Sequence, residues 1–136
     1  AGCPSMILDT SFILDLWDEK PDAVAKARQI DARGEQIYIP TPVLYELWEG
    51  VARSGRPGAE AAKVLEFASG HDLLHFGDSD AREAGLLSGR LSRSGRMMGT
   101  VDVQIAGMAK AREQTLLATD RRFRELSAEI RVEKLP

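Results

Sequence analysis

Four acidic residues lie where their carboxylates can act together: Asp9, Glu46, Asp102 and Asp120. Asp9 and Asp120 each follow a short apolar run typical of a buried strand, whereas the other two lie early in segments typical of amphipathic helices. In a parallel α/β sheet, strand ends and the starts of the following helices meet at one edge, where such folds bind ligands. Four carboxylates gathered there repel one another unless a cation lies between them. The spacing therefore predicts a divalent metal site.

Helical geometry predicts that Glu46 and Asp102 border buried faces. At about 100° per residue, Glu46 lies at the margin of an apolar stripe, whereas Glu49 points further toward solvent. That stripe comprises Val43, Leu44, Leu47, Trp48 and Val51. Asp102 borders a similar stripe that comprises Val101, Ile105, Met108 and Ala109. Each acid also has an ordinary structural explanation, because first-turn acids favour the helix dipole and aspartates after strands often cap helices. The four together favour a common site.

Apolar runs alternate with amphipathic segments along the chain, without a linker or a repeat. The predicted strands span residues 5–8, 37–39, 72–76, 115–118 and 130–134. The predicted helices span residues 12–18, 21–34, 43–53, 59–68, 80–94, 101–112 and 123–127. Strands that alternate with helices of this length indicate a parallel sheet covered on both faces. We expect a three-layer α/β/α fold with a central, mostly parallel sheet.

Polar residues near the predicted helix starts indicate caps. Thr10 or Ser11 can cap the first helix, and the hydroxyl of Thr41 can cap the helix after the second strand. Asp80 and Glu83 match a capping-box spacing at the start of the fifth helix. These local signals predict how the helices begin.

The composition is that of a single globular domain. The 136 residues can bury a core, and 43% hydrophobic against 29% charged residues is ordinary for such a domain. The single cysteine, Cys3, excludes a disulfide framework and a cysteine-based zinc site. We interpret residues 1–5 as an expression-tag remnant and residues 6–136 as one domain. Neither a membrane span nor a signal-peptide pattern is present, so we predict a cytoplasmic protein.

Four segments carry a resemblance to a known family. They are Ile-Leu-Asp-Thr-Ser at 7–11, Pro-Val-Leu-Tyr-Glu-Leu at 42–47, Gly-Thr-Val-Asp-Val-Gln-Ile-Ala at 99–106 and Leu-Ala-Thr-Asp-Arg-Arg-Phe at 117–123. In this order and spacing, the chain resembles the PIN-domain nucleases, and within them the VapC-type toxins of toxin–antitoxin pairs. The resemblance covers nearly the whole chain from Met6 onward and implies a PIN-like fold over residues 6–136.

The resemblance implies an endoribonuclease that depends on a divalent metal. In the family, the acids at the positions of Asp9, Glu46, Asp102 and Asp120 bind Mg²⁺ or Mn²⁺ and support RNA hydrolysis. The resemblance also implies that Ser11 is a hydroxyl near the metal. The partners that it implies are an RNA substrate, a second copy in a homodimer, and a small VapB-like antitoxin whose extended tail lies across the acidic cleft.

The last segment departs from the family pattern. Many relatives carry a threonine two residues before the fourth acid, where this chain has Ala118 and places its hydroxyl at Thr119 instead. A role for Thr119 is therefore not carried over. The fourth acid is also the least uniform member of the set in the family, which makes Asp120 the weakest of the four predicted ligands.

Other residues have weaker claims on function. The net charge of −3 argues against non-specific coating of nucleic acid, although a metal that neutralised the acids would leave nucleic-acid binding open. Candidate phosphate ligands are Arg93, Arg96, Arg121, Arg122 and Arg124. Candidates for a protein-facing surface are Phe12, Leu16 and Trp17, with burial in the core as an equal alternative for each. We interpret His71 and His75 as structural because no further His or Cys is available to complete a zinc site.

Oxygen ligands without His or Cys favour Mg²⁺ or Mn²⁺, and such an ion can activate a water for attack on phosphorus. Two alternatives stay open. A magnesium-dependent phosphoryl-transfer domain of the dehalogenase type would need a second aspartate two residues after Asp9, where this chain has Ser11. The chain can also be a catalytically silent binding module whose acidic pocket receives a partner's arginine. Nucleotide-binding motifs such as GxGxxG or a P-loop are missing from the sequence.

Overall fold

The computed structural model describes residues 5–135 and contains a five-stranded parallel sheet. The strands are β1 (Ser5–Leu8), β2 (Gln36–Pro40), β3 (Asp72–Leu74), β4 (Thr115–Leu117) and β5 (Val132–Glu133). Their spatial order is β3-β2-β1-β4-β5. The predicted tag remnant lies outside the described residues except for Ser5, which begins β1.

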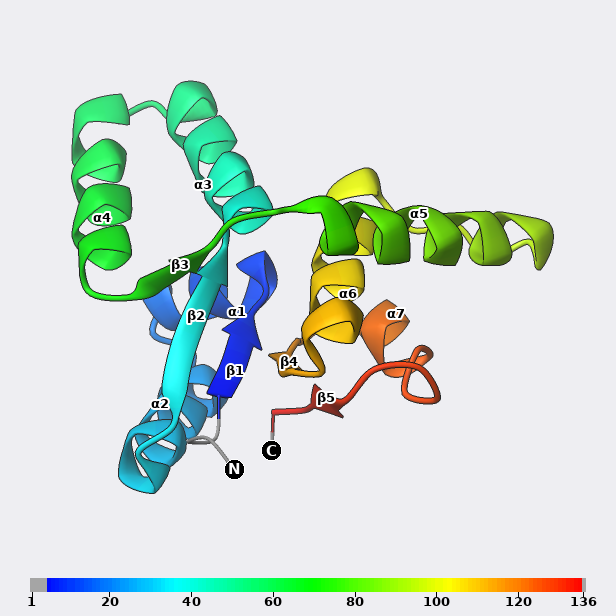
Figure 1. Ribbon diagram of the computed structural model, residues 1–136. Helices are drawn as coiled ribbons and strands as arrows, with labels where there is room; N and C mark the ends of the chain where they lie inside the picture. Colours follow the sequence, from blue (N-terminus) through cyan, green and yellow to red (C-terminus); the bar gives the residue numbers. More distant parts are fainter. Residues whose placement is uncertain (1–4, 136) are drawn as a thin grey trace.

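Helices on both sides of the sheet complete three layers (Figure 1). They are α1 (Thr10–Trp17), α2 (Pro21–Arg33), α3 (Thr41–Arg53), α4 (Pro57–Ser69), α5 (Asp78–Arg93), α6 (Thr100–Arg112) and α7 (Arg121–Arg124). The predicted three-layer α/β/α fold is confirmed, and each predicted strand and helix is present with small differences at its ends. Within residues 5–135, none of the helices has the length and apolar character that crossing a membrane requires.

The strand order reverses beside the central strand. From β1 the chain runs outward through β2 to β3, then returns through α5 and α6 to β4 on the other side of β1. Such a reversal is the topological switch point where α/β sheets open a ligand crevice. Leu8 and Leu117 pair in register, and the backbone N–H of Asp9 donates to the Leu117 carbonyl at 3.2 Å. The residues that follow β1 and β4 therefore lie side by side.

Three predicted helix caps are wrong. Asp9 itself caps α1, because its Oδ1 accepts from the Phe12 backbone N–H at 2.9 Å, and neither Thr10 nor Ser11 does so. The Thr41 hydroxyl accepts from the backbone N–H of Phe76 at 3.2 Å, so it joins α3 to the segment after β3 rather than capping α3. The Thr41 hydroxyl has a partner distant in sequence, which local cap rules do not consider.

The third wrong cap lies at α5. This helix begins at Asp78 with Gly77 as its N-cap, and Asp80 accepts from the Gly77 N–H at 2.9 Å, so Glu83 has no part in a capping box. Asp80 is buried and also pairs with Arg112 at the end of α6, at 2.9 Å. The start of α5 is thereby joined to the end of α6.

Small residues let α5 and α6 cross closely. A Cβ added to Gly107 of α6 would lie 2.6 Å from the Cα, Cβ and N atoms of Ala84 in α5. Ile105 of the same helix is fully buried in the core. The position of α6, and of the acid in its first turn, therefore depends on this contact.

We predict that Gly107→Ala destabilises the protein by about 1–3 kcal/mol, because the added methyl group overpacks the helix crossing. Urea unfolding measures this change. The matched control is Gly89→Ala on α5, where nothing lies within 4 Å of an added Cβ. This control should stabilise the protein by about 0.5–1 kcal/mol, because alanine favours a helix interior. Equal effects of the two substitutions would show that the close crossing does not exist.

Candidate active site

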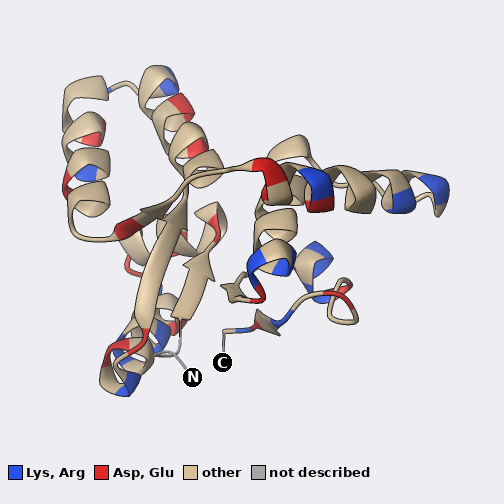
Figure 2. Ribbon diagram, viewed as in Figure 1, with Lys and Arg blue, Asp and Glu red and all other residues tan. Residues whose placement is uncertain are grey.

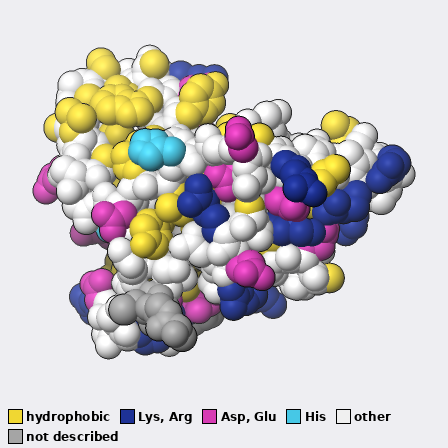
Figure 3. Space-filling view, in the orientation of Figure 1, with side chains coloured by type: hydrophobic (Ala, Val, Ile, Leu, Met, Phe, Trp, Pro, Cys, Tyr) yellow, Lys and Arg dark blue, Asp and Glu magenta, His cyan; other side chains and the backbone are white. Residues whose placement is uncertain are grey.

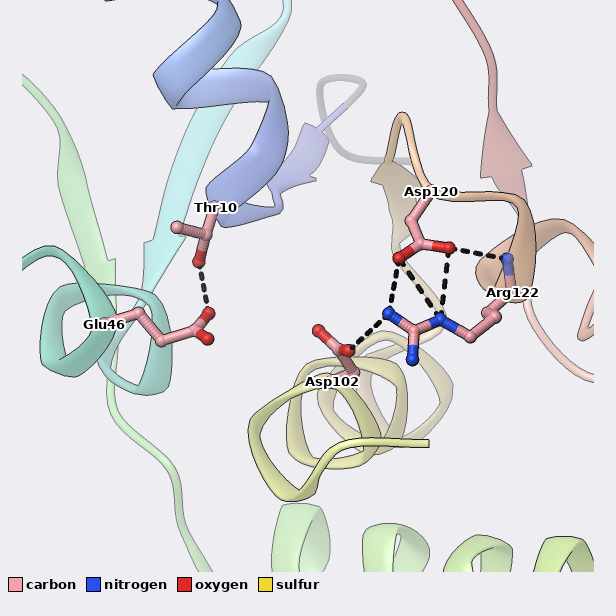
Figure 4. A network of polar contacts seen from close by, with 5 residues as sticks. All are labelled: Thr10, Glu46, Asp102, Asp120 and Arg122. Atoms are coloured by element: carbon pink, nitrogen blue, oxygen red, sulfur yellow. Dashed lines mark hydrogen bonds and ion pairs between the residues drawn. The ribbon is translucent and has the colours of Figure 1, made fainter. Parts of the chain in front are cut away.

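The four predicted acids lie at the carboxyl edge of the sheet, on four different elements. Asp9 follows β1 and Asp120 follows β4, while Asp102 lies in the first turn of α6 and Glu46 in α3. Figure 4 shows the carboxylates of Glu46, Asp102 and Asp120 directed toward one region between α3, α6 and the end of β4. The switch point therefore brings together residues that lie far apart in the sequence.

Asp9 is the most deeply buried of the four acids, with 2% of its surface exposed. Burial raises the pKa of the Asp9 carboxyl to about 7; the negative charges of Asp102 and Asp120 raise it too, and backbone N–H groups of Phe12 and Thr119 oppose the shift. Within residues 5–135, Asp9 forms no ion pair with a Lys, Arg or His. It is a buried acid without a cationic side chain beside it.

Glu46 is held by a hydroxyl from the first turn of α1. The Oγ1 of Thr10 donates to Oε1 of Glu46 at 2.5 Å (Figure 4). The sequence pattern did not reveal this pair, because 36 residues separate its members. Ser11, the hydroxyl that the family resemblance placed near the metal, is exposed. Thr10, which immediately follows Asp9, is instead the hydroxyl that contacts the acidic cluster.

Asp102 and Asp120 share a guanidinium. Nη2 of Arg122 lies 2.8 Å from Oδ2 of Asp120 and 3.6 Å from Oδ2 of Asp102. Hydrogen bonds from Arg122 hold the pKa of Asp120 below its ordinary value. Burial, together with the charge of Glu46, raises the pKa of Asp102, and Arg122 only partly opposes this effect. Arg122 was one of five predicted phosphate ligands, and it alone of them forms an ion pair with these acids.

The donor set fits a hard divalent cation. All four side chains offer carboxylate oxygens, which Mg²⁺ and Mn²⁺ prefer, and the buried Asp9 carboxyl lacks a compensating positive charge among the described residues. In the arrangement described for residues 5–135, no three acid, His or Cys side chains are close enough to share one ion. Glu46 is turned to Thr10 and Asp120 to Arg122, so shared coordination requires side-chain rotation.

Arg93, Arg96 and the two histidines lie apart from this cluster, whereas Arg121 and Arg124 belong to α7, directly after Asp120. Arg93 and Arg96 are exposed at the end of α5 and in the loop after it, where Figure 2 shows basic residues along the outer part of the helix. A ring nitrogen of His71 lies 2.9 Å from the Phe67 carbonyl oxygen, and His75 follows β3 at the edge of the sheet. The contact of His71 agrees with its structural interpretation, whereas the His75 side chain is exposed.

Of the three candidates for a protein-facing surface on α1, one follows the alternative of core burial. Phe12 belongs to the core, with 2% of its surface exposed. Leu16 and Trp17 are partly buried, and the Trp17 ring meets Phe67 of α4 edge-on at 5.7 Å between centroids. The amphipathic pattern of α1 could not distinguish a core contact from a partner contact.

A large cavity lies at the opposite edge of the sheet. It has a volume of about 1080 Å³ and is lined by residues at the starts of strands, including Ser5, Glu35 and Thr115. This cavity contains none of the four acids. Carboxylate chemistry, and not cavity size, therefore identifies the candidate active site.

Comparison with known proteins shows the family of the chain. The model of the PIN domain family matches residues 6–129. The chain belongs to the PIN domain family. One curated relative of this PIN domain is the tRNA(fMet)-specific endonuclease VapC of Shigella flexneri, which is 28% identical over 127 residues, covering 93% of this chain and 95% of the relative.

Solved structures show the same PIN fold. DNA-bound VapBC from Salmonella typhimurium aligns with a TM-score of 0.82 and 26% identity, over 96% of this chain and 98% of that chain. VapBC2 from Rickettsia felis, bound to a promoter DNA fragment, aligns with a TM-score of 0.85 and 23% identity, over 97% and 99% of the two chains. The PIN assignment implies use of a divalent metal, in agreement with the carboxylate donor set.

We predict that this PIN domain loses stability as the pH rises when divalent ions are removed with a chelator. An unfolded aspartate releases its proton near pH 4, whereas folded Asp9 retains its proton up to about pH 7. Between these values the native state binds more protons than the unfolded state, so the free energy of unfolding falls with rising pH. Urea unfolding across this range should show a loss of roughly 2–4 kcal/mol that Asp9→Asn does not show.

The Asn side chain retains an oxygen that can cap α1, so Asp9→Asn should fold. Above pH 7, without divalent ions, this variant should be more stable than the unsubstituted protein. Added Mg²⁺ should stabilise only the protein that retains Asp9, because a ligand that binds the native state raises its stability. The same pH dependence in both proteins would assign the titration to another group.

Proposed function

We propose that this protein is an endoribonuclease that hydrolyses RNA phosphodiester bonds with Mg²⁺ or Mn²⁺, and that it is the toxin of a toxin–antitoxin pair. The observation that carries the proposal is the gathering of Asp9, Glu46, Asp102 and Asp120 at the switch point of a PIN-domain sheet. The relatives named as VapC ribonucleases support the same activity. Which RNA is cleaved is a separate question from the chemistry.

The chain's own residues prepare the site for this reaction. We assign Asp9, Glu46 and Asp102 to hold the ion, which would activate water and neutralise charge on the phosphate. The Phe12 N–H fixes the Asp9 carboxylate on a buried strand end, and the Thr10 hydroxyl orients Glu46. Rigid support of this kind preserves the geometry that a reacting phosphate needs.

The ribose 2′-hydroxyl is not expected to act as the nucleophile. That route needs acid–base groups such as a histidine pair beside the scissile bond. Both histidines of the chain, His71 and His75, flank β3 at the edge of the sheet, whereas the acids gather around the central strands. Attack by water should instead leave products with 5′-phosphate and 3′-hydroxyl ends.

We predict that the purified protein cleaves labelled RNA only with a divalent ion, and that Asp9→Asn lowers the rate at least about 100-fold. Even partners outside a metal's ligand shell cost roughly 10- to 100-fold when mutated, and a ligand should cost more. The control is Asp22→Asn on α2, which removes an exposed carboxylate outside the cluster. Mass spectrometry of the products checks the ends.

Chelator-resistant cleavage that leaves 2′,3′-cyclic phosphates would contradict the proposed reaction. Equal activity in Asp9→Asn and the parent protein, prepared in the same way, would point to a contaminating ribonuclease. A protein that binds RNA but does not cleave it under any of these conditions would support the binding-module alternative.

An apolar patch supports a protein partner, which we propose to be a small VapB-like antitoxin. Large apolar side chains are exposed on α1, α3 and α4, and α3 packs against both other helices. They are Leu14, Tyr45, Trp48 and Leu65. Figure 3 shows hydrophobic side chains gathered over α3 and α4. Exposed apolar patches commonly mark protein interfaces. The resemblance to the VapC-type toxins also leads us to propose a homodimer.

We predict that Leu65→Lys weakens binding of the antitoxin encoded beside this protein at least about tenfold, because a charge in an apolar contact is costly. Leu86→Lys on α5 is the matched control, since Leu65 and Leu86 are 59% and 51% exposed. Titration calorimetry with the product of the neighbouring small reading frame measures both. Equal weakening by the two substitutions would place the antitoxin elsewhere.

A further inference from the structure

Asp120 differs from the other three acids because both oxygens of its carboxylate bind Arg122. Oδ1 accepts from the backbone N–H of Arg122 at 2.9 Å and lies 3.3 Å from its Nε, while Oδ2 lies 2.8 Å from Nη2 and 3.3 Å from Nε. Both oxygens therefore bind one residue, through its main chain and its side chain together. Asp120 also caps the short helix α7 through the first of these bonds.

The other acids hold fewer contacts of this kind. Glu46 accepts a single hydroxyl bond from Thr10, and Asp102 has only the longer 3.6 Å contact to Arg122. An ion that took Asp120 as a ligand would have to break a two-pronged ion pair and the helix cap. An ion bound by Asp102 would disturb only the longer contact.

Part of the Arg122 guanidinium is free of the acids. In Figure 4, Arg122 lies between Asp120 and Asp102, and one of its terminal nitrogens has no contact with either acid. Half of the Arg122 side-chain surface is exposed, so it is accessible to a ligand. A guanidinium held through one edge can offer its remaining N–H groups to a phosphate, whose oxygens it matches in geometry.

We propose that Asp120 is a positioning residue and not a metal ligand: it holds Arg122 so that the guanidinium binds an RNA phosphate beside the metal-binding acids. This proposal rests on the proposed ribonuclease function, and it changes the role that the family resemblance implied for the fourth acid. Arg122 contacts the substrate, whereas Asp120 acts through Arg122. Neutralisation of Asp102 by the metal would strengthen the attraction between Arg122 and the phosphate.

The test compares metal binding with RNA cleavage in four variants of the full chain: Asp102→Asn, Asp120→Asn, Arg122→Ala and the double variant Asp120→Asn/Arg122→Ala. Electron paramagnetic resonance of free Mn²⁺ gives the metal affinity without RNA. Asp102→Asn should weaken Mn²⁺ binding by about tenfold or more, whereas Asp120→Asn should change it less than about threefold. Asn is a good N-cap, so α7 should persist in Asp120→Asn.

Cleavage of a fluorescein-labelled oligoribonucleotide at saturating Mn²⁺ gives the second readout. Asp120→Asn and Arg122→Ala should each raise KM about tenfold, the effect of one lost charge-assisted contact. The double variant should be no worse than either single variant, because both remove the same contact. Arg122→Gln, which keeps most of the side-chain length, should resemble Arg122→Ala and replaces it if that variant does not fold.

Each contrary result has a distinct meaning. Loss of Mn²⁺ binding in Asp120→Asn equal to that in Asp102→Asn would make Asp120 a ligand and overturn the proposal, while the ribonuclease function would stand. Additive effects of Asp120→Asn and Arg122→Ala on KM would overturn the coupling between the two residues. Unchanged Mn²⁺ binding in Asp102→Asn would show that the proposed metal site itself is wrong, and the inference would fail with it.

Discussion

The burial of one carboxylate at the end of the central strand is the constraint on which the active edge depends. Asp9 follows β1, which has neighbours on both sides, so its side chain lies deeper than any other acid of the cluster. A buried charge is costly without a compensating partner, and the nearby carboxylates increase that cost. Either a proton or a cation must compensate it. We propose that the same buried charge gives the domain both a lower stability at neutral pH and its affinity for a divalent ion.

Strand order and helix packing bring the other acids to the edge of the sheet where Asp9 is buried. The reversal of strand order places the residue after β4 beside the residue after β1. The close contact of Gly107 with Ala84, and the ion pair of Asp80 with Arg112, fix α6 against α5. The acid in the first turn of α6, Asp102, therefore reaches the same edge, although its only ion pair there is the 3.6 Å contact to Arg122.

The four acids share an edge but differ in their surroundings. Asp9 is held by a backbone N–H, Glu46 by a hydroxyl, and Asp120 by both prongs of an arginine. Asp102 has only a longer contact, to Arg122, and its pKa is raised because it is partly buried near other negative charges. Carboxylates in such different environments are suited to different roles. A carboxylate that an arginine already neutralises gains less from binding a metal.

The sequence by itself determined the alternation of strands and helices, the parallel sheet and the identity of the four acids, because hydrophobic periodicity and strand-end position are local properties. Tertiary structure decided the partners. Thr10 rather than Ser11 meets the cluster, and Phe12 enters the core instead of facing a partner. Arg122, one of several similar arginines in the sequence, is the one placed between two of the acids. Such contacts join residues distant along the chain, and their geometry depends on how the helices pack on the sheet.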